Sequence, residues 1–129
     1  MSATLNFFLV MLGSAFGGGA RYAIELAFPY TPPNSSLALA TLAVNVLGSL
    51  LAGIFIGLSL PGGPLYASRS ALFLVTGFCG GFTTFSAFSL HTLALLQEGE
   101  PYLALIYVGL SLVLCVLAAA IGYLIGAEL

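Results

Sequence analysis

Residues 77–88 read GFCGGFTTFSAF, and this stretch lies in the middle of a long apolar segment, residues 68–96. Its three glycines and two β-branched threonines disfavour a continuous helix, so we expect the helix to open there. Opened backbone cannot face lipid, because its amide and carbonyl groups would lack hydrogen-bond partners. It is stable at membrane depth only where protein buries it or where it lines a hydrated cavity. The stretch therefore predicts a broken membrane helix with a functional site at the break.

The composition places the rest of the chain in a membrane as well. Hydrophobic residues make up 60% of the 129 residues, charged residues make up 5%, and the mean hydropathy is +1.17. Two basic and four acidic side chains cannot cover a water-soluble domain, so the lipid bilayer must be the main solvent. A net charge of −2 also excludes nucleic acid as a partner. We expect an all-α integral membrane protein.

Four apolar segments account for the chain, and each is long enough to cross a bilayer as a helix. We therefore expect one membrane domain, residues 1–129, with spans at 5–22, 37–60, 68–96 and 102–127. The first connection, 27–36, holds three prolines and then Asn34, Ser35 and Ser36 as candidate N-caps for the second span. The third span is expected to be the broken one.

Orientation follows from the positive residues near span ends, which keep their loops in the cytoplasm. Arg21 ends the first span and Arg69 precedes the third, so in a four-span chain they lie on opposite sides. Each side of the membrane therefore has one positive residue near a span end. We expect the chain to insert in both orientations, which is called dual topology.

Small residues recur at helix-packing spacing in every span. The pairs are Gly13 and Gly17, Gly53 and Gly57, Gly77 and Gly81, and Gly122 and Gly126. Four spans of this size can hardly enclose a path alone, so these packing surfaces point to a dimer. With dual topology, that dimer would be antiparallel.

The side chains around the break favour an anion. Thr84 and Ser86 offer hydroxyl donors, and the rings of Phe85 and Phe88 have positive edges that can meet a partly dehydrated anion. A cation would instead be met by ring faces and carboxylates. The carbonyls of the opened backbone are, in contrast, good ligands for a hard cation.

Polar residues in two other spans have roles that the sequence leaves open. Asn45 interrupts the second span, and its amide either bonds neighbouring helices or donates to an anion. Tyr107, Ser111 and Cys115 lie at i, i+4 and i+8 on one face of the fourth span. Hydroxyls in membranes often bond back to their own helix, so this face alone indicates little.

Titratable and thiol groups are too few for catalysis. Cys79 and Cys115 lie in different spans without the spacing of a disulfide or metal motif, and a lone His91 cannot form a zinc site. With four peripheral glutamates, the chain has no acid–base pair, so we expect it not to be an enzyme.

With these residues, the chain resembles the Fluc (CrcB) family of bacterial fluoride channels across all four spans. The run 77–88 is the most specific part, supported by GGARY at 18–22 and TLAVNVLGS at 41–49. The resemblance implies passive fluoride export across the inner membrane of a prokaryote, by an antiparallel homodimer with two fluoride pathways.

The resemblance also implies roles for particular residues. A structural sodium ion would be held at the dimer centre by backbone carbonyls of Gly80 and Thr83 from both copies. The fluoride pathway would be lined by a set of side chains from all four spans: Arg21, Asn45, Thr84, Phe85, Ser86, Phe88, Tyr107 and Ser111. Arg21 would attract anions near the entrance.

The chain departs from the family pattern at His91, where a carboxylate is common, and at Cys115, where a hydroxyl is common. Ala87 also replaces a frequent threonine. The alternative function is a cation/proton antiporter of the small multidrug-resistance type, which is also a four-span dimer. That class relies on a carboxylate inside the first span, whereas Glu25 lies beyond it and beside Arg21.

Overall fold

The computed structural model describes residues 2–28 and 35–129, and this part of the chain is helical apart from its connections. Four of its helical segments are long and apolar enough to cross a membrane: Ala3–Glu25, Ser36–Gly57, Arg69–Gln97 and Pro101–Glu128. The chain is therefore a multi-pass membrane protein with an all-helical fold, as the composition predicts.

Three of the spans are single helices, and the third is made of four consecutive pieces. The single helices are α1 (Ser2–Glu25), α2 (Ser35–Gly57) and α6 (Pro101–Glu128). The third span consists of α3 (Arg69–Ala71), the π-helix η1 (Leu72–Cys79), α4 (Gly80–Phe82) and α5 (Phe85–Gln97). It is interrupted once, at residues 83 and 84.

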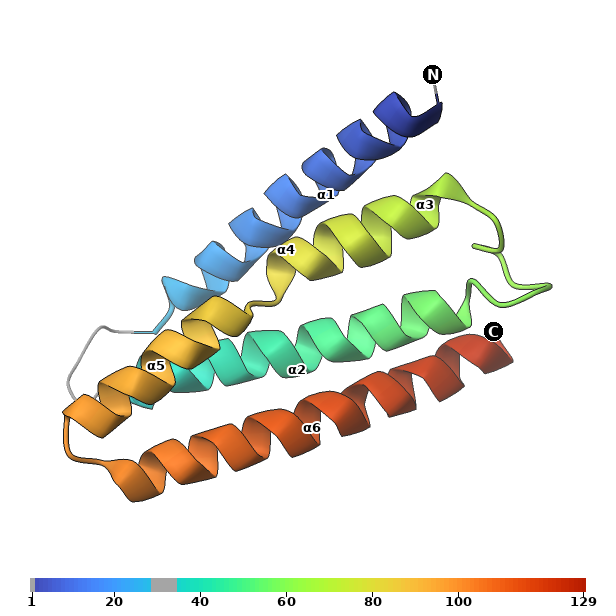
Figure 1. Cartoon of the computed structure of the whole chain (residues 1–129). Helices are drawn as coiled ribbons and strands as arrows, with labels where there is room; N and C mark the ends of the chain where they lie inside the picture. Colours follow the sequence, from blue (N-terminus) through green and yellow to red (C-terminus); the bar gives the residue numbers. More distant parts are fainter. Residues whose placement is uncertain (1, 29–34) are drawn as a thin grey trace.

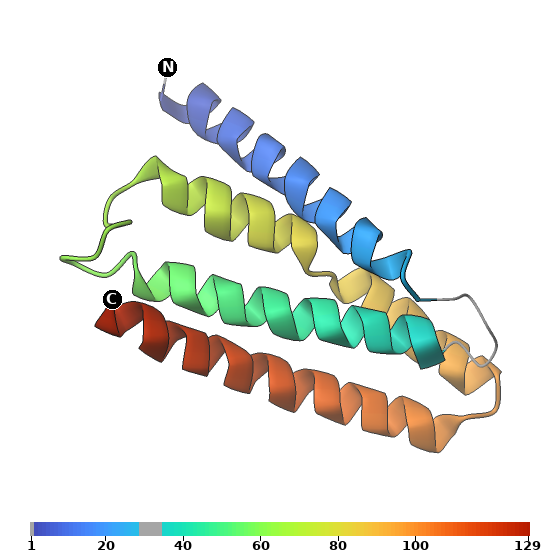
Figure 2. The same cartoon turned by 180° about the vertical axis from the view of Figure 1, so that it is seen from behind.

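The helices pack as two pairs joined by the broken span. Helix α1 lies against η1 and α4, and α2 lies along α6, as Figures 1 and 2 show from opposite sides. After the break, α5 leaves α1 and packs against α2 and α6 instead. The chain ends lie at the same end of the molecule, as expected for four crossings (Figure 1). The break thus carries the chain from one helix pair to the other.

The third span opens within the predicted stretch 77–88, at its two threonines and after its glycines. Thr83 and Thr84 are both extended, with ψ angles of 159° and 123°. Gly77 and Gly81 remain helical, because they are needed where the span meets α1. A β-carbon built on Gly77 would lie 2.9 Å from the Cα of Gly13. π-Helical segments are rare, and they occur frequently at functional sites.

The paired glycines pack helices within one chain. A β-carbon on Gly17 would lie 2.1 Å from the carbonyl oxygen of Phe78, and one on Gly122 would lie 2.1 Å from that of Leu50. Gly53 meets α6 in the same way, 2.2 Å from the oxygen of Ala119. The predicted close packing is therefore confirmed, but it is used inside the chain and gives no argument for a second copy.

The helix bounds differ from the expected spans by up to three residues. The largest differences are at the start of α1 and at its end, and at the end of α2, where Gly57 replaces the expected Leu60. Residues 58–60 form turns instead, with the amide of Ser59 bonded to the carbonyl of Ile56 at 3.0 Å. The prolines of the first connection and the candidate cap Asn34 lie outside the described residues.

Candidate functional site

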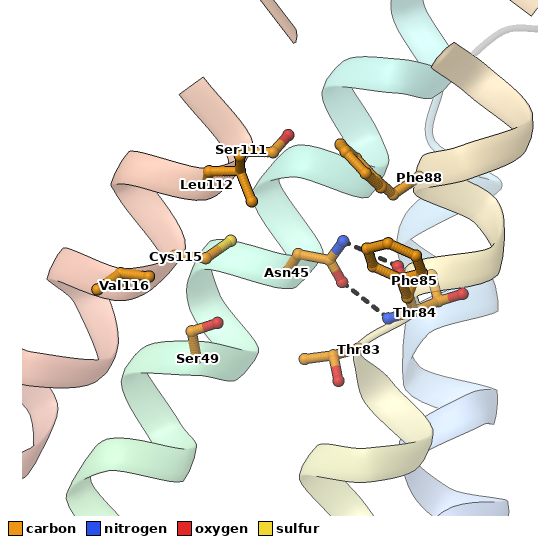
Figure 3. A pocket seen from close by; sticks show the side chains of 10 residues that line it. All are labelled: Asn45, Ser49, Thr83, Thr84, Phe85, Phe88, Ser111, Leu112, Cys115 and Val116. Atoms are coloured by element: carbon orange, nitrogen blue, oxygen red, sulfur yellow. Dashed lines mark hydrogen bonds between the residues drawn. The ribbon is translucent and has the colours of Figure 1, made fainter. Parts of the chain in front are cut away.

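A cavity of about 270 Å³ lies beside the break, between α2, α5 and α6 (Figure 3). It is open on one side, and its lining mixes apolar groups with hydroxyl, amide and thiol groups. The lining residues are Asn45, Ser49, Thr83, Thr84, Phe85, Phe88, Ser111, Leu112, Cys115 and Val116. The lining contains no acidic or basic residue, so an ion in the cavity is met mainly by dipoles.

Asn45 of α2 holds the opened backbone in place. Its Nδ2 donates to the carbonyl oxygen of Thr84 at 3.0 Å, and its Oδ1 accepts from the Thr84 amide at 2.8 Å (Figure 3). The side chain thus replaces the hydrogen bonds that a continuous helix would have made. Of the two roles left open by the sequence, bonding a neighbouring helix is confirmed. One hydrogen on Nδ2 remains beyond this pair of bonds.

Thr84 is the N-cap of α5. Its Oγ1 accepts from the amide of Ala87 at 3.2 Å and lies 3.0 Å from the hydroxyl oxygen of Ser86. Whichever of the two hydroxyls donates to the other, the second keeps a free proton. Helix α5 begins at the cavity, and the N-terminus of a helix carries a partial positive charge. The cap region therefore presents donors and a favourable potential to an anion.

Aromatic rings form one wall of the cavity. The ring centroids of Phe85 and Phe88 are 5.3 Å apart, and that of Tyr107 lies 5.4 Å from Phe88 on the other side. Phe85 is 76% exposed in the single chain, whereas Phe82, three residues earlier, is 3% exposed. Phe82, Phe85 and Phe88 are spaced three residues apart, but the break leaves Phe82 in the core and places Phe85 and Phe88 at the cavity.

The face of α6 toward the cavity carries Ser111 and Cys115. Ser111 is 6% exposed, and its hydroxyl has no hydrogen-bond partner in the described part of the chain. The Ser111 hydroxyl therefore does not bond back to a carbonyl of its own helix, which is the common arrangement for hydroxyls in membrane helices. Tyr107 and Thr41 are likewise buried and lie close together, and Tyr107 lines a second, apolar cavity of about 110 Å³.

Arg21 lies at the carbonyl end of the first half of the span. Its Nε donates to the carbonyl oxygen of Gly81 at 3.4 Å, and a guanidinium nitrogen lies 3.5 Å from the carboxylate of Glu25. A cation is favourable there, because the C-terminal end of a helix is partially negative. The carbonyls of Gly80 and Thr83 accept no hydrogen bond within residues 2–28 and 35–129.

The predicted site residues are thus only partly gathered in one place. The cavity includes Asn45, Thr83, Thr84, Phe85, Phe88 and Ser111. Ser86 and Tyr107 are in contact with members of this set but do not line the cavity. Arg21 and Gly80 lie outside it.

Sequence reasoning missed Ser49 as a lining residue. It follows Asn45 by one helical turn, so the i, i+4 spacing was a usable signal. Cys115 was placed on the same face of the fourth span as Ser111, and both residues line the cavity.

The fold and the site define a class of protein: a helical, multi-pass membrane protein with a neutral, donor-lined cavity at a helix break. Comparison with known families is specific. Residues 8–123 match the model of the family described as "CrcB-like protein, Camphor Resistance (CrcB)". The chain belongs to this CrcB family.

Relatives of similar length support the same assignment. The chain is 44% identical to the "Fluoride-specific ion channel FluC" of Thermus thermophilus, over 96% of this chain and 95% of the relative. A protein of the same description from Methylobacterium radiotolerans is 42% identical, with 93% and 83% covered. A third, from Coxiella burnetii, is 39% identical, with 97% and 100% covered.

Proposed function

We propose that this protein is a fluoride-selective channel that lets fluoride leave the cell passively. The observation that carries the proposal is the uncharged cavity at the N-terminus of α5, with hydroxyl and amide donors on one side and phenylalanine rings on the other. The identity of the anion is taken from the relatives, which are described as fluoride-specific ion channels.

Fluoride exchanges its hydration water for weak contacts with groups along the pathway. Fluoride is met by the remaining Nδ2 hydrogen of Asn45, by the free proton of the Thr84 and Ser86 pair, and by the Ser111 hydroxyl. The edges of Phe85 and Phe88 complete the coordination. Several weak sites without a fixed positive charge allow the ion to leave as easily as it enters. Arg21 and Tyr107 extend the pathway beyond the cavity.

The functional unit is an antiparallel homodimer with two pathways. The cavity is open on one side, and its hydroxyl and amide groups need a cover there because they cannot face lipid. A second copy in the opposite orientation provides one, and the balance of Arg21 against Arg69 supports both orientations.

A sodium ion at the centre of the dimer fits the free carbonyls at the break. Gly80 is exposed on the outer face of the chain, and its carbonyl and that of Thr83 have no donor within the described residues. Two such pairs from two copies would offer oxygen ligands to a hard cation. The ion would offset the partial negative charge at the end of α4. We place the channel in the cytoplasmic membrane of a bacterium, as its relatives are bacterial proteins.

A cation/proton antiporter of the small multidrug-resistance type is not favoured. Such a transporter needs a titrating carboxylate in its substrate site, but no acidic side chain lines the described cavity. Glu25 is paired with Arg21 at 3.5 Å.

Liposomes loaded with fluoride test the proposal directly. Protein purified and reconstituted at low density should release fluoride when a potassium ionophore supplies the counter-current, and chloride release should be negligible. Phe85→Ile and Asn45→Ala should slow fluoride release strongly, whereas Ile56→Ala, at an exposed position of α2 that lines neither cavity, should not. Equal release of chloride and fluoride would refute the assignment, as would proton-coupled movement of an organic cation.

A further inference from the structure

Cys115 occupies a position that the proposed conduction does not require. It is a free thiol on α6, half-buried, in the lining of the cavity, and its sulfur points toward Asn45 across the opening (Figure 3). The only other cysteine of the chain, Cys79, is 3% exposed and does not line the cavity. The two thiols therefore differ sharply in access.

The cavity must contain water. The Ser111 hydroxyl, one turn before Cys115, is buried without a partner in the described residues, and leaving it so in hydrocarbon would cost about 1–3 kcal/mol. Asn45 has a further N–H to satisfy. A space of about 270 Å³ can hold several waters, which would bond to these groups. The same water would bring a dissolved reagent to the Cys115 thiol, which lines this space.

From these contacts we propose that Cys115 is a covalent modification site, and that small thiol-specific electrophiles entering from water attach to its sulfur and close the cavity. The reagents concerned are low-molecular-weight disulfides and alkyl thiosulfonates. With a methanethiosulfonate, the Cys115 thiol gives its proton to water, and its sulfur attacks the sulfenyl sulfur of the reagent. A new S–S bond forms, the old S–S bond breaks, and methanesulfinate leaves with the electron pair.

Modification should stop conduction, and this part rests on the proposed function. An aminoethylthio group on Cys115 projects from α6 toward Asn45, where it occupies the space beside the Thr84 cap. It also brings a positive charge into a cavity whose lining is neutral, which would hold an anion in place rather than pass it. Reduction of the new disulfide should restore the original side chain and the original rate.

The experiment uses the full chain in liposomes and 2-aminoethyl methanethiosulfonate as the probe. Intact-mass and peptide mass spectrometry measure the adduct, and fluoride release is measured on the same vesicles. The chain without substitutions and the Cys79→Ser variant should each gain one adduct, at Cys115. Their fluoride release rate should fall by about tenfold or more. Cys115→Ser should gain none and keep its own untreated rate, and dithiothreitol should reverse every effect. Cys115→Ala serves the same purpose if the serine variant fails to fold.

Several outcomes would overturn the inference. Absence of an adduct at Cys115 in folded, reconstituted protein would show that water does not reach the thiol. Equal labelling of Cys79 and Cys115 would show that the cavity does not select between them. An adduct at Cys115 with an unchanged release rate would refute closure. If the untreated protein releases no fluoride, the proposed function fails, while the adduct still reports on the modification site.

Discussion

Replacing Asn45 by alanine should release the opened segment of the third span. The amide holds both the N–H and the C=O of Thr84, at 2.8 and 3.0 Å. Each buried backbone group left without a partner costs about 1–3 kcal/mol, so the loss of both would cost about 2–6 kcal/mol. Water in the adjacent cavity can reach one of the two groups, so we expect about 2 kcal/mol.

Hydrogen exchange at the Thr84 amide measures this change locally. A cost of about 2 kcal/mol in the opening equilibrium corresponds to about thirtyfold faster exchange. Ser49→Ala is the matched control, because it removes a polar group from the same helix and cavity one turn away. Asn45→Asp should be intermediate, since its carboxyl keeps the acceptor for the Thr84 amide. The reasoning is refuted if Asn45→Ala exchanges within about threefold of Ser49→Ala at this amide.

Three further predictions concern stability and the halves of the broken span. Gly17→Ala should disrupt the packing of α1, because its β-carbon would lie 2.1 Å from the Phe78 oxygen. Gly19→Ala is the control and should be tolerated, because no atom lies within 4 Å of its β-carbon. Equal thermal stability of the two variants in detergent would contradict this prediction. Thr84→Val should lower the free energy of unfolding by about 0.5–2 kcal/mol through loss of the α5 cap, and Thr84→Ser should retain most of it. Arg21→Gln should also destabilise the fold, by about 1 kcal/mol, because it removes the charge facing the α4 carbonyls; the loss should shrink at high salt, and the prediction fails if stability is unchanged at low salt.

The sequence was sufficient to predict the class of fold, since hydrophobicity and span length depend only on composition along the chain. It also located the interruption of the third span within a stretch of 12 residues, 77–88. It did not predict that Thr83 and Thr84 would be the extended pair. That choice depends on α1, which requires Gly77 and Gly81 to stay helical for close backbone contact.

The candidate site was predicted less completely, because pair contacts between spans are not visible in one sequence. Asn45 and Thr84 are 39 residues apart, and no periodicity connects them. The family resemblance implies that Arg21 attracts anions near the entrance, and its hydrogen bond to the Gly81 carbonyl is a contact that the sequence did not predict. The liposome experiment above tests the assignment of Asn45 and Phe85 to the pathway, and the assignment of Gly80 and Thr83 to sodium is a prediction.

The bond between Asn45 and Thr84 also bears on how the chain can enter the bilayer during synthesis. Asn45 leaves the ribosome before Thr84, so α2 is made before the extended segment. The nascent third span can therefore meet an amide that already lies at its own depth. An order of synthesis with the broken span first would expose the Thr84 backbone to lipid. We infer that span order protects the break during membrane insertion.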